Sequence, residues 1–492
     1  MPPHNTYNGT HKIFWSKYNS RIIFFGALGL VLFFLHLALM FLSHGFATDI
    51  VLTDKPVLTF VILELTASAI FLATIFIMRS MQANGSVLIF VVLIGMAMRV
   101  PMMASTPILE NDFNRYLLDG TLVANGYNPY RYSPMDIQAR ADYVPRKLLN
   151  MVQGGKYVIE NVNYPHLRTI YPPVAQVTFA LAYFIKPWSL LAWKFVLSIF
   201  DLATTILLLV AIRDLELSSI WIAVYWWNPL VLREIFNSAH MDVIILPFVI
   251  GALLLNARRH YVLAVVLLAL ATGTKLWPLL LLPILLWPIR RKSGAFLANL
   301  LVFGIICGLF FVPIYMSSLD DASGFMAYSR MWEMNDALYM MVFWAVKYFA
   351  PLIGYGANTT HLVTRLIAGI TLIVWIAWVI KKRFPDQLQM WEKALLIVAC
   401  LFMVSPTQFP WYYVWVIPFL TVRPRISLFV LNALLPFYYI RFYFQAHHDV
   451  GTFDTYLVWL QYIPAWILMG WEVREARKGI DPWLGNPVHH PT

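Results

Sequence analysis

The sequence has 492 residues, of which 60% are hydrophobic and 12% are charged, and its formal net charge is +11. Soluble domains carry about 25% charged residues, so this composition excludes a cytosolic globular enzyme, a disordered chain and a secreted domain built on disulfides. Hydrophobic runs recur along the whole length, and the two cysteines form neither a disulfide framework nor a metal spacing. We therefore expect a single, all-helical, polytopic membrane domain over residues 1–492.

Eleven hydrophobic stretches have the length of a membrane-spanning helix, which needs about 20 mostly apolar residues. They are 22–44, 56–78, 85–105, 190–212, 217–234, 241–257, 295–316, 359–381, 388–405, 426–442 and 455–472. Three shorter stretches with polar or proline breaks, at 261–275, 277–290 and 411–422, are also expected to cross the membrane. The sequence therefore predicts about fourteen crossings.

Basic residues beside the expected spans predict their orientation, because cytoplasmic loops of membrane proteins are enriched in Lys and Arg. Lys12, Lys17 and Arg21 precede the first span, and alternation from there places the later basic clusters on the same side. We expect a multi-pass protein of the plasma (inner) membrane with both termini cytoplasmic, including a tail at 473–492. The excess positive charge then reflects topology, and we expect no nucleic-acid partner.

Two short hydrophobic stretches bounded by proline, 173–188 and 337–352, would break this alternation if they crossed. We expect half-helices that enter from the outer side, which are tolerated only against protein or a water-filled cavity. The longest segment outside the spans, 106–172, then becomes an extracytoplasmic loop. This loop is where we expect the chemistry.

The loop begins with acidic residues that directly follow a span. Glu110 and Asp112 stand at the membrane surface, and Asp119 follows after Arg115. Ionisable groups beside a membrane cavity are costly and are candidates for function, and a carboxylate there can accept a proton from a hydroxyl nucleophile. The alternative is that these acids cap a helix or pair with Arg115.

Cations on the same side supply a second set of candidates. Arg168, in Y-P-H-L-R, and Lys275, in T-G-T-K-L-W-P, suit a phosphate at the membrane surface. Nonspecific lipid binding by Arg168, or pairing of Lys275 with Glu234 or Asp242, is the alternative in each case. The tyrosines of N-G-Y-N-P-Y-R-Y suit a sugar ring, or serve only as an aromatic-anchored turn.

The sequence holds no P-loop, no G-x-G-x-x-G, no G-x-S-x-G and no H-E-x-x-H. These absences argue against nucleotide-driven and serine-hydrolase chemistry, and the histidines form no metal set. Four charged residues lie within or beside the hydrophobic spans, namely Glu64, Arg99, Lys194 and Asp201. They are either satisfied between helices or belong to a proton or substrate relay.

Taken in order, the motifs resemble the GT-C superfamily of polyprenyl-phosphate-sugar-dependent glycosyltransferases, and most closely the bacterial polyprenol-phosphomannose-dependent alpha-1,6-mannosyltransferases. The resemblance covers roughly residues 100–415. It is carried by an acidic start followed by R-Y-x-x-D-G (115–120), by G-x-N-P-Y (126–130), Y-P-P-x-A-Q (171–176), N-P-L (228–230), N-S-x-H-x-D (237–242), K-L-x-P (275–278), W-x-x-N (332–335) and S-P-T-x-x-P-W-Y (405–412).

The resemblance implies a GT-C-like helix bundle and an inverting transfer of mannose or another monosaccharide. Asp112 would be the general base, Glu110 would assist it, and Lys275 and Arg168 would bind the donor phosphate. Substrate contacts would come from Arg115, Tyr116, Asp119, Asn128, Tyr130, His166, Tyr171, His240, Asp242, Trp332, Asn335, Trp411 and Tyr412. The implied partners are membrane lipids, a polyprenyl-phosphate sugar donor and a glycan, glycolipid or protein acceptor, with a divalent metal not expected to be obligatory.

A transporter or flippase for a lipid-linked sugar is the main alternative. Such proteins favour internal repeats and broken helices near the membrane midplane. The expected half-helices cluster on the outer side, and the two halves of the sequence show no convincing symmetry. A scaffold within an envelope-assembly complex is a third alternative, which the many outward polar motifs disfavour.

Overall fold

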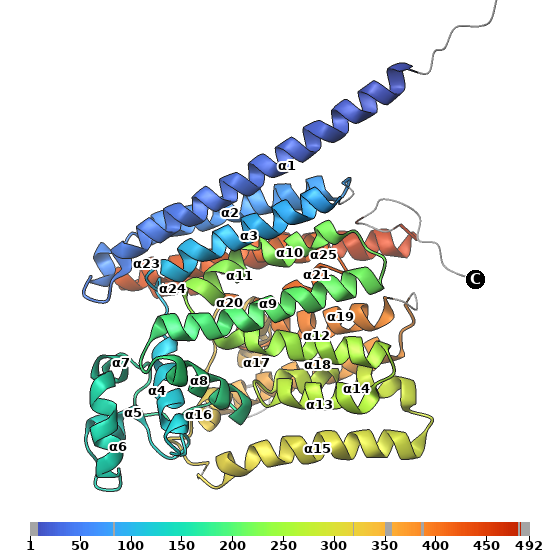
Figure 1. Cartoon of the computed structure of the whole chain (residues 1–492). Coiled ribbons are helices and arrows are strands. Elements are labelled where there is room, and N and C mark those ends of the chain that lie inside the picture. Colours follow the sequence, from blue (N-terminus) through green and yellow to red (C-terminus); the bar gives the residue numbers. More distant parts are fainter. Residues whose placement is uncertain are drawn as a thin grey trace, which may run out of the picture.

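The structure is a computed structural model that describes residues 8–81, 84–317, 319–349, 357–384, 388–480 and 483. These residues form helices joined by turns and loops, with one isolated β-bridge between Met334 and Thr407. Most of the long helices run side by side in one bundle (Figure 1). The all-helical fold class expected from the sequence is confirmed.

Seven helical segments of the described residues are long and apolar enough to cross a membrane. They are α1 (Asn8–Ser43), α2 (Val57–Met78), α3 (Gly85–Ala104), α9 (Leu190–Asp214), α15 (Ser293–Tyr315), α18 (Ala357–Lys381) and the run of α22 (Ile426–Leu434) and α23 (Ile440–Ala446). An eighth candidate is a helix pair that is bent by 108° between Asn237 and Met241. The chain is an integral membrane protein by this measure, and the finer expectation of about fourteen crossings depends on shorter helices.

Several expected spans are short or interrupted helices. They include α12 (Ile245–Ala257), α13 (Tyr261–Thr272), α19 (Gln389–Val404), α25 (Trp459–Arg477) and the short pieces α20 (Pro410–Tyr413) and α21 (Ile417–Leu420). The stretch 217–234 is not one helix, because α10 (Ala223–Trp226) ends before Pro229 and a π-helical turn, η5 (Leu232–Asn237), follows. Proline lacks the N–H that an interior helical hydrogen bond needs.

Proline also breaks the stretch 277–290. Three short pieces replace a continuous helix there, namely η7 (Trp277–Leu281), α14 (Leu282–Leu286) and η8 (Trp287–Ile289). Each piece carries a proline in its first turn, where the missing N–H costs no helical hydrogen bond. The local backbone chemistry therefore sets these boundaries.

The expected half-helices correspond to α8 (Pro173–Ile185) and α17 (Ala337–Phe349). Residues 350–352 of the second stretch lie outside the described residues, as does most of the expected tail at 473–492 beyond residue 480. The first turn of α8 begins with Pro173, as a helix start allows. The two stretches thus form helices too short to cross a bilayer alone.

The segment 106–172 folds as a small helical unit at one end of the bundle (Figure 1). It contains α4 (Phe113–Ala124), α5 (Pro134–Gln138), α6 (Arg146–Met151) and α7 (Lys156–Glu160). Side chains such as Leu118, Leu122, Leu148 and Ile159 form a separate apolar core there. The first turn of α1 and the last turn of α25 lie at the opposite end of the bundle (Figure 1).

Three of the four charges expected within spans are satisfied between helices. Arg99 forms a buried ion pair with Asp201 at 2.8 Å, and its guanidinium stacks 3.3 Å from the centre of the Trp226 ring. Tyr225 donates a further hydrogen bond to Asp201 at 2.8 Å. Lys194 donates to three backbone carbonyls at the end of α3, those of Met102, Met103 and Ser105. A buried charge is tolerated when it is paired or fully hydrogen-bonded in this way.

Gly120 sets how closely α4 approaches α8. A Cβ at this position would be forced into the backbone carbonyl of Phe179 on α8. We expect Gly120→Ala to separate the two helices and to cost about 1–3 kcal/mol through overpacking, seen as a lower Tm of the detergent-purified protein.

Gly304→Ala on α15 is the matched control, because a Cβ there meets open space. Removing a glycine from an open helical position should stabilise that helix by about 0.5–1 kcal/mol. Equal Tm values for the two variants would contradict the close approach of α4 and α8.

Candidate active site

The site begins with the backbone that leaves α3. The side chain of Asn237 donates to the Ser105 hydroxyl at 2.7 Å and to the Thr106 carbonyl at 2.8 Å, and it accepts from the Ile108 N–H at 3.0 Å. Arg233 donates to the Ile108 carbonyl at 2.8 Å. Buried backbone groups need such partners. The residues leading to Glu110 are therefore fixed from the bent segment that contains η5.

Arg233 and Glu234 form the buried centre of this bent segment. Their ion pair measures 2.9 Å, and both side chains are fully buried. Tyr439 donates to the second oxygen of Glu234 at 2.7 Å, and Arg233 also donates to the Ser238 hydroxyl at 2.6 Å. These extra hydrogen bonds are what a buried ion pair requires to offset its desolvation.

Glu110 lies next to this pair. One of its carboxylate oxygens is buried and has no hydrogen-bond partner among the described residues. Burial raises the pKa of Glu110 well above its ordinary value, and the negative charge of Asp112 acts in the same direction. Burial and the neighbouring carboxylate therefore both disfavour the ionised form of Glu110.

Asp112 stands at the position before α4, but its side chain does not cap that helix. Its carboxylate is 29% exposed, with one oxygen 3.9 Å from Nδ1 of His240 and the other 3.4 Å from the side-chain nitrogen of Asn163. Burial raises the pKa of Asp112, while the hydrogen bond from Asn163 and the charge of Lys275 oppose the rise. The capping alternative is not realised for Asp112, and its carboxylate stays partly exposed.

His240 lies between Asp112 and Glu234. Its Nε2 is 3.6 Å from a Glu234 oxygen, and its ring stacks on Trp411 at 4.0 Å between centroids. The Phe409 ring also stacks on the Trp411 ring, with 4.3 Å between their centroids. The imidazole is thus positioned by an aromatic stack and by two carboxylates.

Lys275 supplies the positive charge opposite Asp112. It pairs with Asp242 at 2.8 Å, and Trp415 donates to the same Asp242 oxygen at 2.7 Å. The ammonium also lies 3.8 Å from the centre of the Tyr412 ring and keeps 20% of its side chain exposed. The pair with Asp242, one of the expected alternatives, is therefore present. An ammonium has three N–H donors, so this pair leaves donors for another group.

Several expected site residues instead hold loop 106–172 together. Arg115 donates to the carbonyls of Leu167, Asn163 and Tyr164 at 3.0–3.2 Å. Asp119 accepts a hydrogen bond from Gln176 at 3.1 Å, which ties α4 to α8. Burial raises the pKa of Asp119 to about 6.

Tyr116 and Tyr130 of this loop are buried and contact other protein groups. Tyr116 is buried and stacks on Phe179 at 4.8 Å, with Tyr171 at its edge. Tyr130 donates to the Tyr171 carbonyl at 2.7 Å. Asn128 accepts from the Tyr130 N–H and donates to the Ser317 hydroxyl at 2.8 Å, so it builds a turn.

Other expected residues lie apart from Asp112. Arg168 pairs with Asp320 and donates to the Ser317 carbonyl at 3.0 Å, and His166 is exposed. Asn335 bonds the side chain of Gln461 and the carbonyl of Gln408. It lines a separate cavity of about 210 Å³.

The segment around Trp332 joins the segment that carries Trp411. The Met334 N–H donates to the Pro406 carbonyl at 2.9 Å, and the Gln408 N–H donates to the Met334 carbonyl at 3.0 Å. Trp332 packs against Tyr164 at 4.6 Å. The motifs 332–335 and 405–412 therefore meet in space although 73 residues separate their starts.

The structure therefore brings together Asp112, Glu110, His240, Asp242, Lys275, Trp411 and Tyr412. Sequence reasoning missed Asn163, Arg233, Asn237 as an anchor, Trp415 and Tyr439. Only Arg233 gave a signal, because a charge next to Glu234 in an apolar run needs a partner. No group of three or more His, Cys, Asp or Glu side chains in the described part of the chain is arranged to hold a metal ion.

Comparison with known proteins identifies the family. The sequence profile of the MptA/B family, described as the N-terminal domain of alpha-(1->6)-mannopyranosyltransferase, matches residues 22–291, which is more than half of the chain. Searches of curated proteins and of solved structures gave no significant match. The matched range includes Asp112, His240 and Lys275. The chain belongs to the alpha-(1->6)-mannopyranosyltransferase family, a family of hexosyltransferases, as its motifs predicted.

Proposed function

We propose that this protein transfers mannose from a polyprenyl-phosphate donor to an acceptor hydroxyl, with inversion at the anomeric carbon and an alpha-1,6 linkage in the product. Family membership supports the sugar and the linkage. The observation that carries the mechanism is the uncapped, part-exposed carboxylate of Asp112, on which the charge of the Lys275 ammonium acts. A base and a cation placed in this way suit transfer from a phosphate leaving group.

In the proposed reaction Asp112 accepts the proton of the acceptor hydroxyl. The acceptor oxygen forms a bond to the anomeric carbon while the bond from that carbon to the lipid phosphate breaks. The phosphate leaves with the electron pair, and Lys275 neutralises the charge that grows on it. Glu110 assists by holding a proton beside Asp112, and no obligatory metal enters this scheme.

The two proposed phosphate ligands are not equivalent. Lys275 has one acidic partner, Asp242, and shares its charge with Asp112. The Arg168 guanidinium is engaged by Asp320 and by the Ser317 carbonyl. We therefore assign the leaving phosphate to Lys275 first and give Arg168 a role in holding the loop around the donor.

The remaining residues divide into two proposed roles. His240, Trp411, Tyr412, Tyr171 and Trp332 offer ring faces and polar atoms for the sugar and its acceptor. Arg115, Tyr116, Asp119, Asn128 and Tyr130 act by positioning the loop, since their polar groups bind protein atoms. His166, Asp242 and Asn335 are not assigned a direct contact with substrate. They support the proposed substrate surface through the residues beside them.

We also propose the finer topology. The shorter helices join the candidate spans to give about fourteen crossings of one integral domain, 1–492, with α8 and α17 as half-helices. Both chain ends would then be cytoplasmic, and loop 106–172 would present Asp112 on the extracytoplasmic side, where donor and a glycan, glycolipid or protein acceptor meet. The basic residues at span ends and the placement of α1 and α25 opposite loop 106–172 (Figure 1) support this arrangement.

Replacing the proposed base is the direct test. Purified protein is incubated with polyprenyl-phosphomannose or with a nucleotide-linked mannose and an alpha-mannoside acceptor, and products are identified by mass spectrometry. We expect product only from the lipid donor, and a loss of at least about 100-fold for Asp112→Asn, because general base catalysis contributes about 10²–10⁴-fold. Asp142→Asn is the matched control, since Asp142 is an exposed aspartate of the same loop.

Wild-type turnover by Asp112→Asn would overturn the assignment of the base. Lipid scrambling in proteoliposomes without any sugar transfer would instead favour the flippase alternative. Sugar transfer and lipid scrambling are measured on the same reconstituted protein, so a negative result in one can be compared directly with the result of the other.

The pH dependence of kcat/KM should report the ionisation of Asp112. The base works only when ionised, and burial raises its pKa above that of an ordinary aspartate. Activity should therefore be full at high pH and fall about tenfold per pH unit below this raised pKa. A rate that stays flat down to pH 4, in protein that remains folded by its fluorescence, would contradict Asp112 as the base.

Substitutions of the two cations separate their roles. We expect Lys275→Gln to reduce kcat by about 10²–10³-fold, the usual loss when one charge-stabilising group is removed, with partial retention in Lys275→Arg. Arg168→Gln should cost less and should lower the Tm, because it frees Asp320 and the Ser317 carbonyl. A larger loss of kcat in Arg168→Gln than in Lys275→Gln would reverse the assignment.

A further inference from the structure

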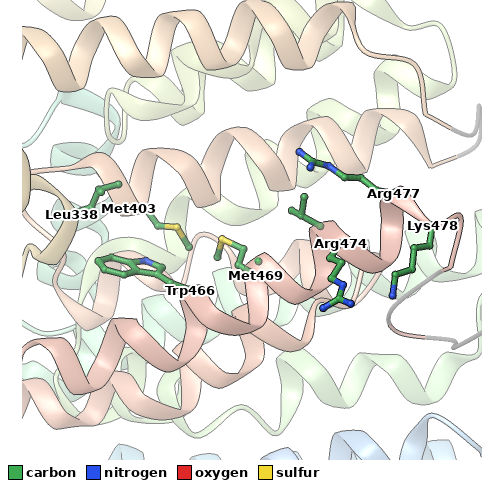
Figure 2. A pocket seen from close by; sticks show the side chains of 9 residues that line it. Leu338, Met403, Trp466, Met469, Arg474, Arg477 and Lys478 are labelled. Carbon is green, nitrogen blue, oxygen red and sulfur yellow. The ribbon is translucent and has the colours of Figure 1, made fainter.

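A groove runs along α25, at the end of the bundle opposite loop 106–172. Figure 2 shows Trp466 and Met469 of α25 facing Met403 of α19 along its length, with Arg474 and Arg477 at one end. The cavity measures about 700 Å³. None of the residues that line it belongs to the proposed active site.

The groove continues into a larger cavity. This second cavity measures about 1340 Å³ and shares four lining residues with the first, namely Leu338, Met403, Met469 and Val473. It extends between α18, α19 and α22 toward the basic segment Lys381–Arg383. The two cavities together form what we call the α25 groove.

The length of the α25 groove matches one leaflet of a membrane. Trp466 and Arg477 line it eleven residues apart on one helix, which is about 17 Å at 1.5 Å per residue. Half of a hydrocarbon core of about 30 Å is about 15 Å. An acyl chain of one leaflet would therefore extend from the basic end to Trp466.

The basic end of the α25 groove has an excess of positive charge. Ten Lys and Arg side chains but only two acids, Glu392 and Glu472, line the two cavities. Glu392 is already bound by Arg423 and Arg425, and Glu472 accepts hydrogen bonds from the backbone and side chain at residues 426 and 427. The two acids therefore leave most of the basic residues uncompensated.

Arg474 and Arg477 are the clearest uncompensated cations. Both are exposed, and neither has an acidic partner among the described residues. Lys478 beside them pairs with Glu475 at 2.7 Å. An anionic headgroup would supply the charge that these two arginines lack.

The walls of the α25 groove are suited to lipid. Val473 on α25 and Trp378 on α18 line these cavities and are 49% and 46% exposed, as expected of helix faces that meet acyl chains. Such large apolar side chains are not left exposed to water in contiguous patches without a partner. The groove therefore opens sideways into the membrane.

Two other occupants fit less well. The donor phosphate would have to lie near Lys275, which does not line the α25 groove. Residues 481–492 contain one acidic side chain, Asp481, which is too few to match the charge of the groove. Charge and length together select a membrane lipid.

We propose that the α25 groove binds an anionic glycerophospholipid, with its phosphate at Arg474 and Arg477 and an acyl chain along Met469 and Trp466. Basic pockets between transmembrane helices on the cytoplasmic side recognise anionic headgroups in this way. The inference does not depend on the glycosyl-transfer mechanism. It does use the orientation in which both chain ends face the cytoplasm.

The test counts lipids retained by the full chain. Protein is purified from detergent containing equal amounts of phosphatidylglycerol and phosphatidylcholine, and bound lipids are measured by native mass spectrometry. We expect wild-type protein to retain phosphatidylglycerol at least about tenfold over phosphatidylcholine. The triple variant Arg474→Gln, Arg477→Gln, Lys478→Gln should lose this preference.

The control triple variant removes three other exposed cations, Arg259, Arg291 and Lys292, which do not line the groove. It should keep the preference for phosphatidylglycerol. Equal preference in the wild type and the groove variant would overturn the proposal, and so would an equal loss in both triple variants. Displacement of the retained lipid by polyprenyl phosphate at equal concentration would assign the groove to the donor instead.

A second variant tests the apolar part without changing charge. Gly470 lines the groove, and a Cβ there would meet open space, so Gly470→Phe fills the acyl path without a clash. We expect it to lower the total retained lipid at least about threefold, as judged on protein that elutes as a single monodisperse peak. Gly369→Phe on α18 is the control, because Gly369 is also open but lies outside the groove. Unchanged lipid in Gly470→Phe would contradict the acyl path.

Discussion

The placement of Asp112, the proposed catalytic base, depends on how the backbone leaves α3. At the end of a helix the last carbonyls lose their helical partners, and here those carbonyls are away from water. Lys194 binds three of them, and Asn237 and Arg233 bind the residues that follow. These partners come from α9 and from the bent segment around η5. The direction in which residues 106–112 run is thus set by side chains about 85 to 130 residues away in the sequence.

The same bent segment also sets the charge balance beneath Asp112. Arg233 is one cation shared with Glu234 and close to Glu64 and Glu110, so carboxylates outnumber cations in the buried layer. A negative charge on Asp112 is therefore disfavoured unless a nearby cation offsets it. Lys275 is that cation, and Asp242 with Trp415 keeps it there. The charges of Asp112, the proposed base, and Lys275, the proposed phosphate ligand, therefore depend on each other.

The sequence predicts the helices better than it predicts the partners of polar residues. Hydrophobic length locates α2 and α3 almost to the residue, because it depends on local burial. It overestimates continuity at 217–234, where Asn228 and Pro229 break the helix. The acidic start at Glu110 and Asp112 was visible because charges beside a span are rare. The pairing of Arg168 with Asp320 could not be predicted from the sequence, because a contact across 152 residues depends on the tertiary fold.

One criterion separates the structural cations of this protein from those available to ligands. A positive charge at membrane depth needs compensation, and Arg99, Lys194 and Arg233 receive it from buried protein atoms. Lys275 pairs with one carboxylate, that of Asp242, and acts electrostatically on a second, that of Asp112. Arg474 and Arg477 receive none from the described residues. The degree of compensation therefore agrees with the two phosphate sites proposed above, one at Lys275 for the phosphate that leaves during sugar transfer and one at Arg474 and Arg477 for a bound lipid.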